Sequence, residues 1–559
     1  MNLRNVKAVI LLLSAIFISC TSNADKTEQV VSTDAPRIIN LINFIRQTDY
    51  RVEDADRLLF ETVQEQIKLI NEYKFPATFL FQYDALINPL YQELMKKELA
   101  SDCEIGAWWE ITQPHVEAAG IKWRGEHSWV SHANIAFTTG YTPQEREKLV
   151  DVYMAKFKEI YGYYPKSVGS WFIDSYTLAY MYEKYKIVAS CNCKDQIGTD
   201  GYTLWGGYWN QAYYPSRTNA YMPAQTAEYQ IPVPVFRMLG SDPVYQYDTG
   251  LGRERQGVIS LEPVYKESGM NKEWVEYFLE SIVNQPCLAF NYAQAGQENS
   301  FTWSGMRKGL EMQFPLFDSL RIAGKIRVET LETSGKWFKE QFQHTPATAV
   351  TTLTDIRNEG RKSVWFNSRY YRTNLLWEGK SFRFRDLHLF DEKFESAYYK
   401  TAGEGNQFFY YTLPVVDGFM WSTSDDRAGL RIIKTDEEGN KLEILFKDPV
   451  VKEIDKDILQ VTCEDESQHT FYMTFYEDRF EVSCEPHAKE LNWMLELKTA
   501  QGVELPFQSF NKNNIKASFR DFSYTISCKE GTVSEGTASA DYVFRLVPVN
   551  NKLVVDCKN

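Results

Sequence analysis

The stretch Ser167-Val-Gly-Ser-Trp-Phe-Ile-Asp174 decides the fold expected for this chain. It has the form of a short buried strand that ends in an aspartate and carries a tryptophan close by. A helix is predicted directly before it over residues 142–162, where Thr142 and Glu145 have the spacing of a capping box. In a barrel of parallel strands, side chains at the carboxyl ends of the strands face the barrel mouth, so Asp174 is expected there.

The same pattern, an apolar strand followed by Glu, Asp or Trp, recurs along the first 300 residues. We expect strands over residues 37–45, 76–84, 103–110, 167–174, 186–191, 258–265 and 286–292, and a weaker one over 233–239. Segments with helical spacing separate them, and strands that alternate with helices predict parallel βαβ units. The expected fold class is therefore α/β, a (β/α)7-type parallel barrel of seven or eight units. A doubly wound open sheet is the alternative.

The periodicity changes around residues 340–360. Downstream, apolar residues alternate at every second position and hairpin signals appear, most clearly over residues 429–446. We therefore expect a (β/α) barrel domain over residues 36–345 and an all-β sandwich domain over residues 360–559.

The first residues have the form of a lipoprotein signal peptide. Basic residues precede an apolar run over residues 8–18, and Cys20 follows closely. Residues 1–20 are predicted to be the signal peptide, with Cys20 lipidated, and residues 21–35 a polar tether. An ordinary secretory signal is the alternative. No later run approaches the roughly 18 apolar residues of a membrane span. The expected location is the bacterial cell envelope, at the periplasmic face or the cell surface, held by a lipid anchor only.

Composition narrows the class of partner. The 559 residues are 44% hydrophobic and 15% aromatic, which is ample for a large core. A formal net charge of −14 argues against nucleic acid, which requires a basic surface. The many Trp and Tyr residues suit a carbohydrate partner, and they suit an aromatic core equally well. No cofactor is indicated, and the sequence carries no signal of an oligomeric state.

Acidic residues at the predicted strand ends suggest a chemistry. Glycosidic bond cleavage typically needs two carboxyl groups, one to protonate the leaving oxygen and one to attack the sugar or activate water. The candidate catalytic residues are Glu110, Asp174, Glu262 and Glu298. Singly, each is better explained as a structural carboxylate, but together, beside tryptophans, they favour a site. Asp174 would be the nucleophile or base, and Glu298 or Glu262 the acid with a raised pKa.

Helical and strand periodicity both lapse over residues 192–257. Loops this long inside a compact domain are usually functional. We expect this segment and the aromatic residues at the strand ends to bind substrate. The candidates are Trp108, Trp109, Trp171, Asp200, Trp205, Trp209, Tyr214, Arg217 and Tyr292.

The histidines do not predict a metal site. His127 and His132 are five residues apart and so share neither a helix face nor a strand face, and His115 is isolated. No metal ligands are therefore assigned.

At these residues the chain resembles the glycoside hydrolase/deacetylase superfamily. Its catalytic domain is a seven-stranded (β/α) barrel, often followed by β-sandwich domains. Glu104-Ile-Gly106 stands where its deacetylases carry a similar Glu-Ile-Gly, but Trp108 and Thr112 stand in place of their metal-binding histidines. For barrel glycosidases of the superfamily, the resemblance implies a nucleophile after the fourth strand and an acid from a later one, comparable to Asp174 and Glu298.

The whole chain also resembles an uncharacterised lipoprotein family of glycan-degrading Gram-negative bacteria. The segments that carry this resemblance are 200–207, 213–217, 296–303 and 413–418. Three functional hypotheses follow. The leading one is a lipid-anchored glycoside hydrolase. The second is a metal-dependent carbohydrate deacetylase that uses Asp49 and some of the three histidines. The third is a non-catalytic glycan-binding lipoprotein.

Overall fold

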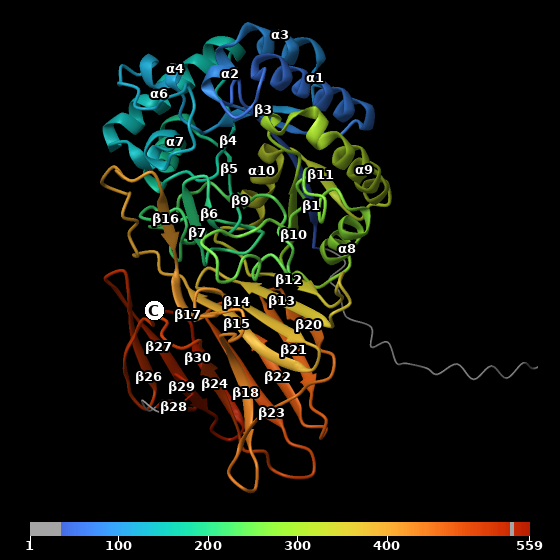
Figure 1. The fold of residues 1–559 in the computed structure, drawn as a ribbon, viewed down its shortest axis with the longest axis vertical. Helices are drawn as coiled ribbons and strands as arrows, with labels where there is room; N and C mark the ends of the chain where they lie inside the picture. Colours follow the sequence, from blue (N-terminus) through green and yellow to red (C-terminus); the bar gives the residue numbers. More distant parts are fainter. Residues whose placement is uncertain (1–34, 537–540) are drawn as a thin grey trace, which may run out of the picture.

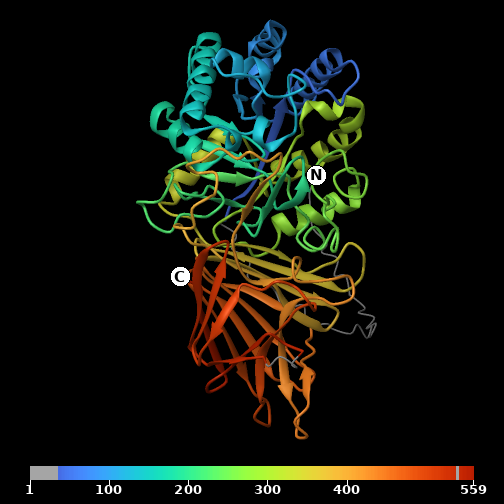
Figure 2. The same cartoon turned by 60° about the vertical axis from the view of Figure 1, so that its left-hand side comes forward.

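The computed structural model describes residues 35–536 and 541–559. An α/β part from the N-terminal half and a β-rich part from the C-terminal half are stacked along the longest axis (Figures 1 and 2). The predicted signal peptide, Cys20 and all but the last residue of the predicted tether lie outside the described residues. None of the described helices combines the length and the hydropathy needed to cross a membrane.

The α/β part is built on a nearly closed sheet of nine strands. Seven of them are parallel and follow the order β10-β1-β2-β3-β4-β5-β9. Their bounds are β1 (Arg37–Ile45), β2 (Thr78–Phe81), β3 (Glu104–Trp108), β4 (Ser167–Gly169), β5 (Ala189–Asn192), β9 (Val235–Arg237) and β10 (Asn291–Ala295). Within residues 35–536 and 541–559 no ladder joins β9 to β10. The other two strands are β8 (Ala212–Tyr213), antiparallel to β9, and β11 (Arg327–Glu329), parallel to β1.

Helices follow most of these strands and cover the sheet (Figure 1). All nine residues of β1 are buried, as expected for a parallel strand with both faces covered. The capping box predicted before β4 is confirmed: the Thr142 side chain accepts from the Glu145 amide, and the Glu145 carboxylate accepts from the Thr142 amide. The helices are α1 (Ala55–Tyr73), α2 (Tyr83–Ile87), α3 (Pro89–Glu98), α4 (Gln113–Ala118), α5 (Ala133–Ala136), α6 (Pro143–Tyr161), α7 (Ser175–Tyr185), α8 (Lys272–Val283), α9 (Thr302–Ile322) and α10 (Leu331–Gln341).

The prediction of a strand over residues 258–265 is wrong. Only Ser260 pairs there, as an isolated antiparallel bridge to Ser241, and the chain then turns back. Pro263 has no amide hydrogen, so it cannot continue a ladder. The weaker candidate over residues 233–239, in contrast, contains β9.

The segment expected as a long loop holds a hairpin of its own, β6 (Gln196–Thr199) and β7 (Tyr202–Trp205). A strand from the C-terminal half, β16 (Phe408–Tyr411), pairs in parallel with β7 and completes a three-stranded sheet. Figure 1 shows β16 reaching from the β-rich part to lie beside β7.

The β-rich part contains two large sheets. The ten-stranded sheet consists of β12 (Thr348–Thr352), β13 (Arg361–Asn367), β14 (Tyr371–Glu378), β15 (Ser381–Leu389), β17 (Leu413–Asp417), β18 (Gly429–Thr435), β19 (Lys441–Glu443), β24 (Trp493–Lys498), β28 (Thr532–Glu535) and β29 (Phe544–Val547). The eight-stranded sheet consists of β20 (Val450–Asp455), β21 (Ile458–Glu464), β22 (Thr470–Phe475), β23 (Arg479–Glu485), β25 (Phe507–Phe510), β26 (Asn514–Phe519), β27 (Phe522–Glu530) and β30 (Lys552–Asp556). All strand pairs within these sheets are antiparallel.

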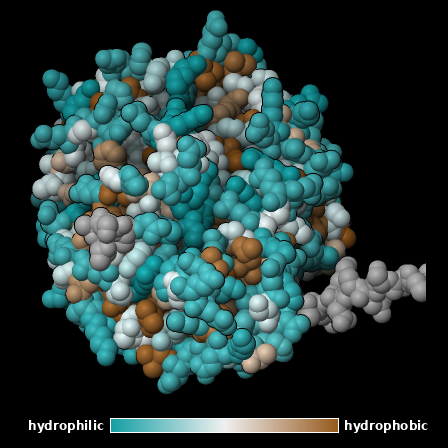
Figure 3. Space-filling view, turned by 60° about the horizontal axis from the view of Figure 1, so that its bottom comes forward, coloured by the Kyte–Doolittle hydropathy of each residue, from teal (hydrophilic) through white to brown (hydrophobic). Residues whose placement is uncertain are grey.

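Aromatic side chains join the two sheets. The rings of Phe384 on β15 and Phe480 on β23 lie 5.5 Å apart, and those of Phe471 on β22 and Trp493 on β24 lie 5.3 Å apart. Buried residues alternate with partly exposed ones along β21, as expected for a strand with one solvated face. On the face seen in Figure 3, hydrophobic side chains form small separate groups among hydrophilic ones.

Candidate active site

A pocket of about 280 Å³ lies at the carboxyl ends of the barrel strands. Its walls come from the segments that follow β1, β4, β9 and β10 and from the β6–β7 hairpin, which is where barrel proteins place their sites. The lining includes Arg51, Trp171, Asp200, Tyr202, Glu262, Tyr265 and Glu298. Two candidate catalytic carboxylates, Glu262 and Glu298, therefore share one cavity.

Glu298 follows β10 and is buried. Its Oε1 accepts a hydrogen bond from Ser300 Oγ at 2.8 Å, and its Oε2 lies 3.1 Å from Arg46 Nη1. Burial raises the pKa of Glu298 to about 7; the nearby Glu110 also raises it, whereas Arg46 lowers it. A carboxyl group with this pKa can hold a proton near neutral pH, which is what a general acid requires.

Glu262 lies in the turn that replaces the expected strand. Its Oε2 accepts from Ser260 Oγ at 2.7 Å, and its Oε1 accepts from Gln297 Nε2 at 3.0 Å. Burial raises the pKa of Glu262, but these two hydrogen bonds and the charge of Lys194 oppose the shift by favouring the ionised form. Because Gln297 precedes Glu298 in the chain, this contact links the two carboxyl groups across the rim.

Arg46, directly after β1, is the centre of a buried charge cluster. It binds Glu110 through two hydrogen bonds, Nε to Oε2 at 3.0 Å and Nη2 to Oε1 at 2.8 Å, and its Nη1 lies 3.2 Å from Asp49. Glu110 also accepts from Trp108 Nε1 at 2.8 Å and from Gln82 Nε2 at 2.6 Å. Since these donors occupy its carboxylate, Glu110 is suited to hold Arg46 in place.

The structure places Asp174 away from the pocket, contrary to our expectation. Its carboxylate caps α7 by accepting from the Thr177 amide at 3.0 Å, and it pairs with the buried Arg146 at 2.9 Å. Thr138 Oγ1 donates to it at 2.6 Å. An aspartate at the end of a strand and the start of a helix is a helix cap as readily as a pocket residue. A segment with helical spacing follows the expected strand over residues 167–174, and it was the signal for this role.

The aromatic candidates at the strand ends divide between wall and core. Trp171 lines the pocket. Trp108 is buried behind it, with its ring 5.4 Å from Trp171. Trp109 packs against Tyr153 of α6, and Tyr292 is also fully buried. Trp171 is therefore the member of this set that is placed to contact a ligand.

The candidates from the long segment divide in the same way. Asp200 lines the pocket. Trp205 and Trp209 instead face the β-rich part, where Trp209 stacks on Trp365 with ring centres 3.8 Å apart. Tyr214 donates to the Phe342 carbonyl, and Arg217 pairs with Glu183 at the surface. These four side chains hold the segment in place and do not line the cavity.

Asp49 and the histidines, which a metal-dependent deacetylase would use as metal ligands, are not arranged to hold a metal ion together. His115 is buried, its Nε2 lies 2.8 Å from the Leu149 carbonyl, and burial lowers its pKa to about 4. His127 stacks on Tyr50, and Asp49 is held by Arg46 and by a second arginine. In the part of the chain that the structure describes, no three His, Cys, Asp or Glu side chains converge to hold a metal ion.

Several site residues were not predicted. The role of Arg46 could have been predicted, because this residue directly follows the first expected strand. A buried cation at that place is expected to have acidic partners. Gln297 and Ser260, which orient Glu262, carry no sequence signal of that role. Lys194 follows β5 closely, is buried, and has no hydrogen-bond partner for Nζ among the described residues. Burial lowers the pKa of Lys194.

Fold and site together define a barrel-like α/β protein with a paired-carboxylate pocket at the carboxyl ends of its strands. No protein-family model matches the chain, and no curated protein matches it. Among solved structures it is similar to a candidate glycoside hydrolase/deacetylase from Parabacteroides distasonis. That match has a TM-score of 0.51 and 15% identity and covers 69% of this chain and 92% of that one.

A candidate polysaccharide deacetylase from Mycobacterium smegmatis gives a TM-score of 0.35 and 11% identity, covering 56% of this chain and 94% of that one. At such identities the likeness to the first structure concerns the fold alone. It agrees with the expected barrel fold. The activity has to be argued from the pocket.

Proposed function

We propose that this protein is a glycoside hydrolase that acts on a poly- or oligosaccharide. The observation that carries the proposal is the placement of Glu262 and Glu298 in one pocket, each buried and each with a raised pKa. Glycosidic bond cleavage requires two carboxyl groups whose surroundings favour the protonated form of one and the ionised form of the other.

Glu298 is assigned as the general acid. Its pKa of about 7 leaves it largely protonated below neutral pH, so it can donate a proton to the oxygen of the breaking glycosidic bond. Glu262 is assigned as the base or nucleophile, because Ser260 and Gln297 donate hydrogen bonds that favour its ionised form. It attacks the anomeric carbon directly or removes a proton from the attacking water.

The rest of the pocket suits a sugar. Trp171 offers an apolar ring surface, and the polar groups of Asp200 and Arg51 can bind hydroxyl groups. We further propose that Cys20 carries a lipid anchor that holds the barrel domain over residues 36–345 and the sandwich domain over residues 360–559 to the cell envelope, at the periplasmic face or the cell surface.

The test is release of new reducing ends from a panel of soluble polysaccharides by the purified chain lacking its first 20 residues. Turnover should be lost in Glu298→Gln and Glu262→Gln and kept in Glu267→Gln, a matched change at an exposed glutamate nearby. Titration calorimetry with the same glycans would test the alternative hypothesis of a non-catalytic glycan-binding protein. Glycan binding without turnover in the unmodified protein would indicate a non-catalytic binding protein and contradict the proposal.

A further inference from the structure

The hairpin β6–β7 supplies one wall of the pocket, through Gln196, Thr199, Asp200 and Tyr202. Isolated two-stranded hairpins are marginally stable in water. Here β7 gains a second neighbour, because Tyr202 to Trp205 pair with Phe408 to Tyr411 of β16. The pocket wall is therefore completed by a strand from the C-terminal half of the chain.

The base of the hairpin is fixed by buried charges. Asp195, just before β6, accepts from Arg237 Nη2 of β9 at 2.7 Å and from Arg372 Nη1 of β14 at 2.5 Å. Arg372 also binds Asp386 of β15 through two hydrogen bonds of 2.9 and 2.8 Å. All four side chains are at most 3% exposed. Removing one partner of such a buried ion pair costs stability, because the other charge is then left buried and unpaired.

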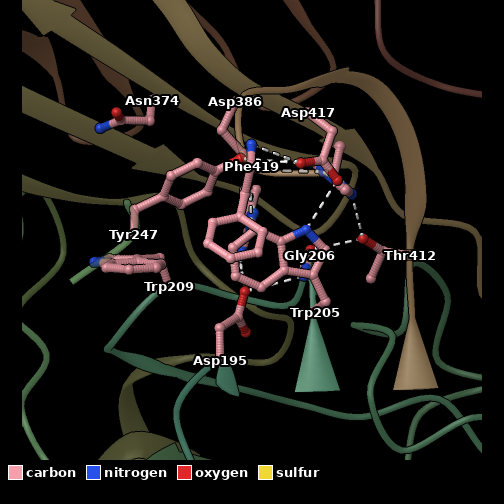
Figure 4. A network of polar contacts seen from close by, with 12 residues as sticks. Asp195, Trp205, Gly206, Trp209, Tyr247, Asn374, Asp386, Thr412, Asp417 and Phe419 are labelled. Carbon is pink, nitrogen blue, oxygen red and sulfur yellow. Dashed lines mark hydrogen bonds and ion pairs between the residues drawn. The ribbon is translucent and has the colours of Figure 1, made fainter. Parts of the chain in front are cut away.

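The end of β7 lies beside the start of β6 and is held by hydrogen bonds (Figure 4). Asp195 Oδ2 accepts from the Gly206 amide at 3.0 Å, and the Gly206 carbonyl accepts from Thr412 Oγ1 at 2.7 Å. Trp205 Nε1 donates to Asp417 Oδ2 at 2.9 Å. Both strands of the hairpin are thus attached, at the end opposite its turn, to the ten-stranded sheet or to the segment that enters it.

We propose that the β-rich part is a component of the substrate site and that Arg372 is a positioning residue for the reaction, acting through Asp195 on the hairpin. This inference rests on the proposed glycoside hydrolase function. It gives the C-terminal half a role beyond that of an attached module, because the wall that carries Asp200 and Tyr202 depends on contacts from β14, β16 and the segment around Thr412.

The test compares two variants with a control. Arg372→Lys keeps the charge and loses the paired contact with Asp386, and Thr412→Val removes the hydrogen bond to Gly206. The control is Arg545→Lys, which alters an arginine–glutamate pair between β29 and β24 of the same sheet, remote in the ladder order from β14. Amide hydrogen exchange over residues 196–205 and steady-state kinetics on the active glycan are measured for each.

We expect faster exchange over residues 196–205 in Arg372→Lys and Thr412→Val, with kcat/KM lower by roughly 10- to 100-fold and most of the change in KM. Arg545→Lys should match the unmodified protein in both readouts. Unchanged exchange in this segment in a folded variant would overturn the proposal. If Arg372→Lys does not fold, the result for Thr412→Val alone decides whether contacts from the β-rich part hold the hairpin. The exchange result stands even if no glycan is hydrolysed, so failure of the coupling and failure of the proposed function are separable.

Discussion

Arg46 Nη1 lies 3.1 Å from Oε2 of Glu298, yet the pKa of that carboxyl group is raised to about 7. An adjacent arginine normally lowers the pKa of a carboxyl group. Here burial outweighs it, and Arg46 shares its charge with Glu110 and Asp49. The cluster therefore fixes the position of Glu298 without forcing it to ionise at neutral pH.

This relationship predicts the alkaline limb of the pH profile. A general acid acts in its protonated form, so kcat/KM should fall about tenfold per pH unit above pH 7. The midpoint should lie near the pKa of Glu298, about 7. Steady-state rates from pH 4 to 9 check this. If the residual activity of Glu298→Gln falls at the same pH, the fall is caused by the ionisation of another group.

Replacing the acid should reduce catalysis without unfolding the protein. Glu298→Gln keeps the shape and the hydrogen bond from Ser300 and removes the transferable proton. We expect kcat to fall by roughly 10² to 10⁴, with the melting temperature within a few degrees of the original. The loss should be smallest for substrates with good leaving groups, such as nitrophenyl glycosides, because they need little protonation. An equal loss for both substrate classes would argue that Glu298 has a different role.

The sequence predicted the strands of the barrel better than the site. Long apolar runs such as residues 37–45 are recognisable because both faces of a parallel strand are buried. The stretch over residues 258–265 has similar composition, and only its tertiary position and Pro263 show that it turns. Its carboxylate, Glu262, nevertheless reaches the rim, because the turn lies where a strand end would.

Side-chain direction was the missing information. Glu298 and Asp174 each follow a buried strand, but Glu298 faces the cavity and Asp174 caps α7. The tryptophans of the long segment were expected to bind sugar, and Trp209 instead packs against Trp365, about 150 residues away in sequence. Sequence periodicity gives no information on contacts between elements so far apart. The same limit hid the connection between Asp195 and Arg372.

Asp174 gives a prediction opposite in kind to that for Glu298. In Asp174→Asn the buried Arg146 loses its charged partner, which typically costs about 3–5 kcal/mol. The free energy of unfolding should fall by that order in urea titrations, whereas kcat of the folded protein should stay within about twofold, because Asp174 does not line the pocket. Loss of kcat at full stability would restore the nucleophile role that the sequence suggested.

Glu104 allows a test of stability against pH away from the site. It begins β3, at the end opposite the pocket, and accepts from Thr78 Oγ1 at 3.0 Å and from the Glu332 amide at 2.9 Å. Burial raises its pKa from 4.5 to about 7. The folded state therefore favours the protonated form, and this contribution to stability is full below pH 4.5 and lost as the pH rises through 7.

A shift of this size corresponds to roughly 3 kcal/mol of unfolding free energy over that window. Because Gln is neutral at every pH, Glu104→Gln should make the decline between pH 5 and 8 shallower than in the unmodified protein. Asp84, whose pKa burial also raises to about 7, and Glu298 would account for part of the slope that remains. Urea denaturation at pH 5, 6, 7 and 8 measures the difference. Parallel curves for the two proteins would mean that Glu104 is ionised in the folded state throughout, and that the two hydrogen bonds outweigh its burial.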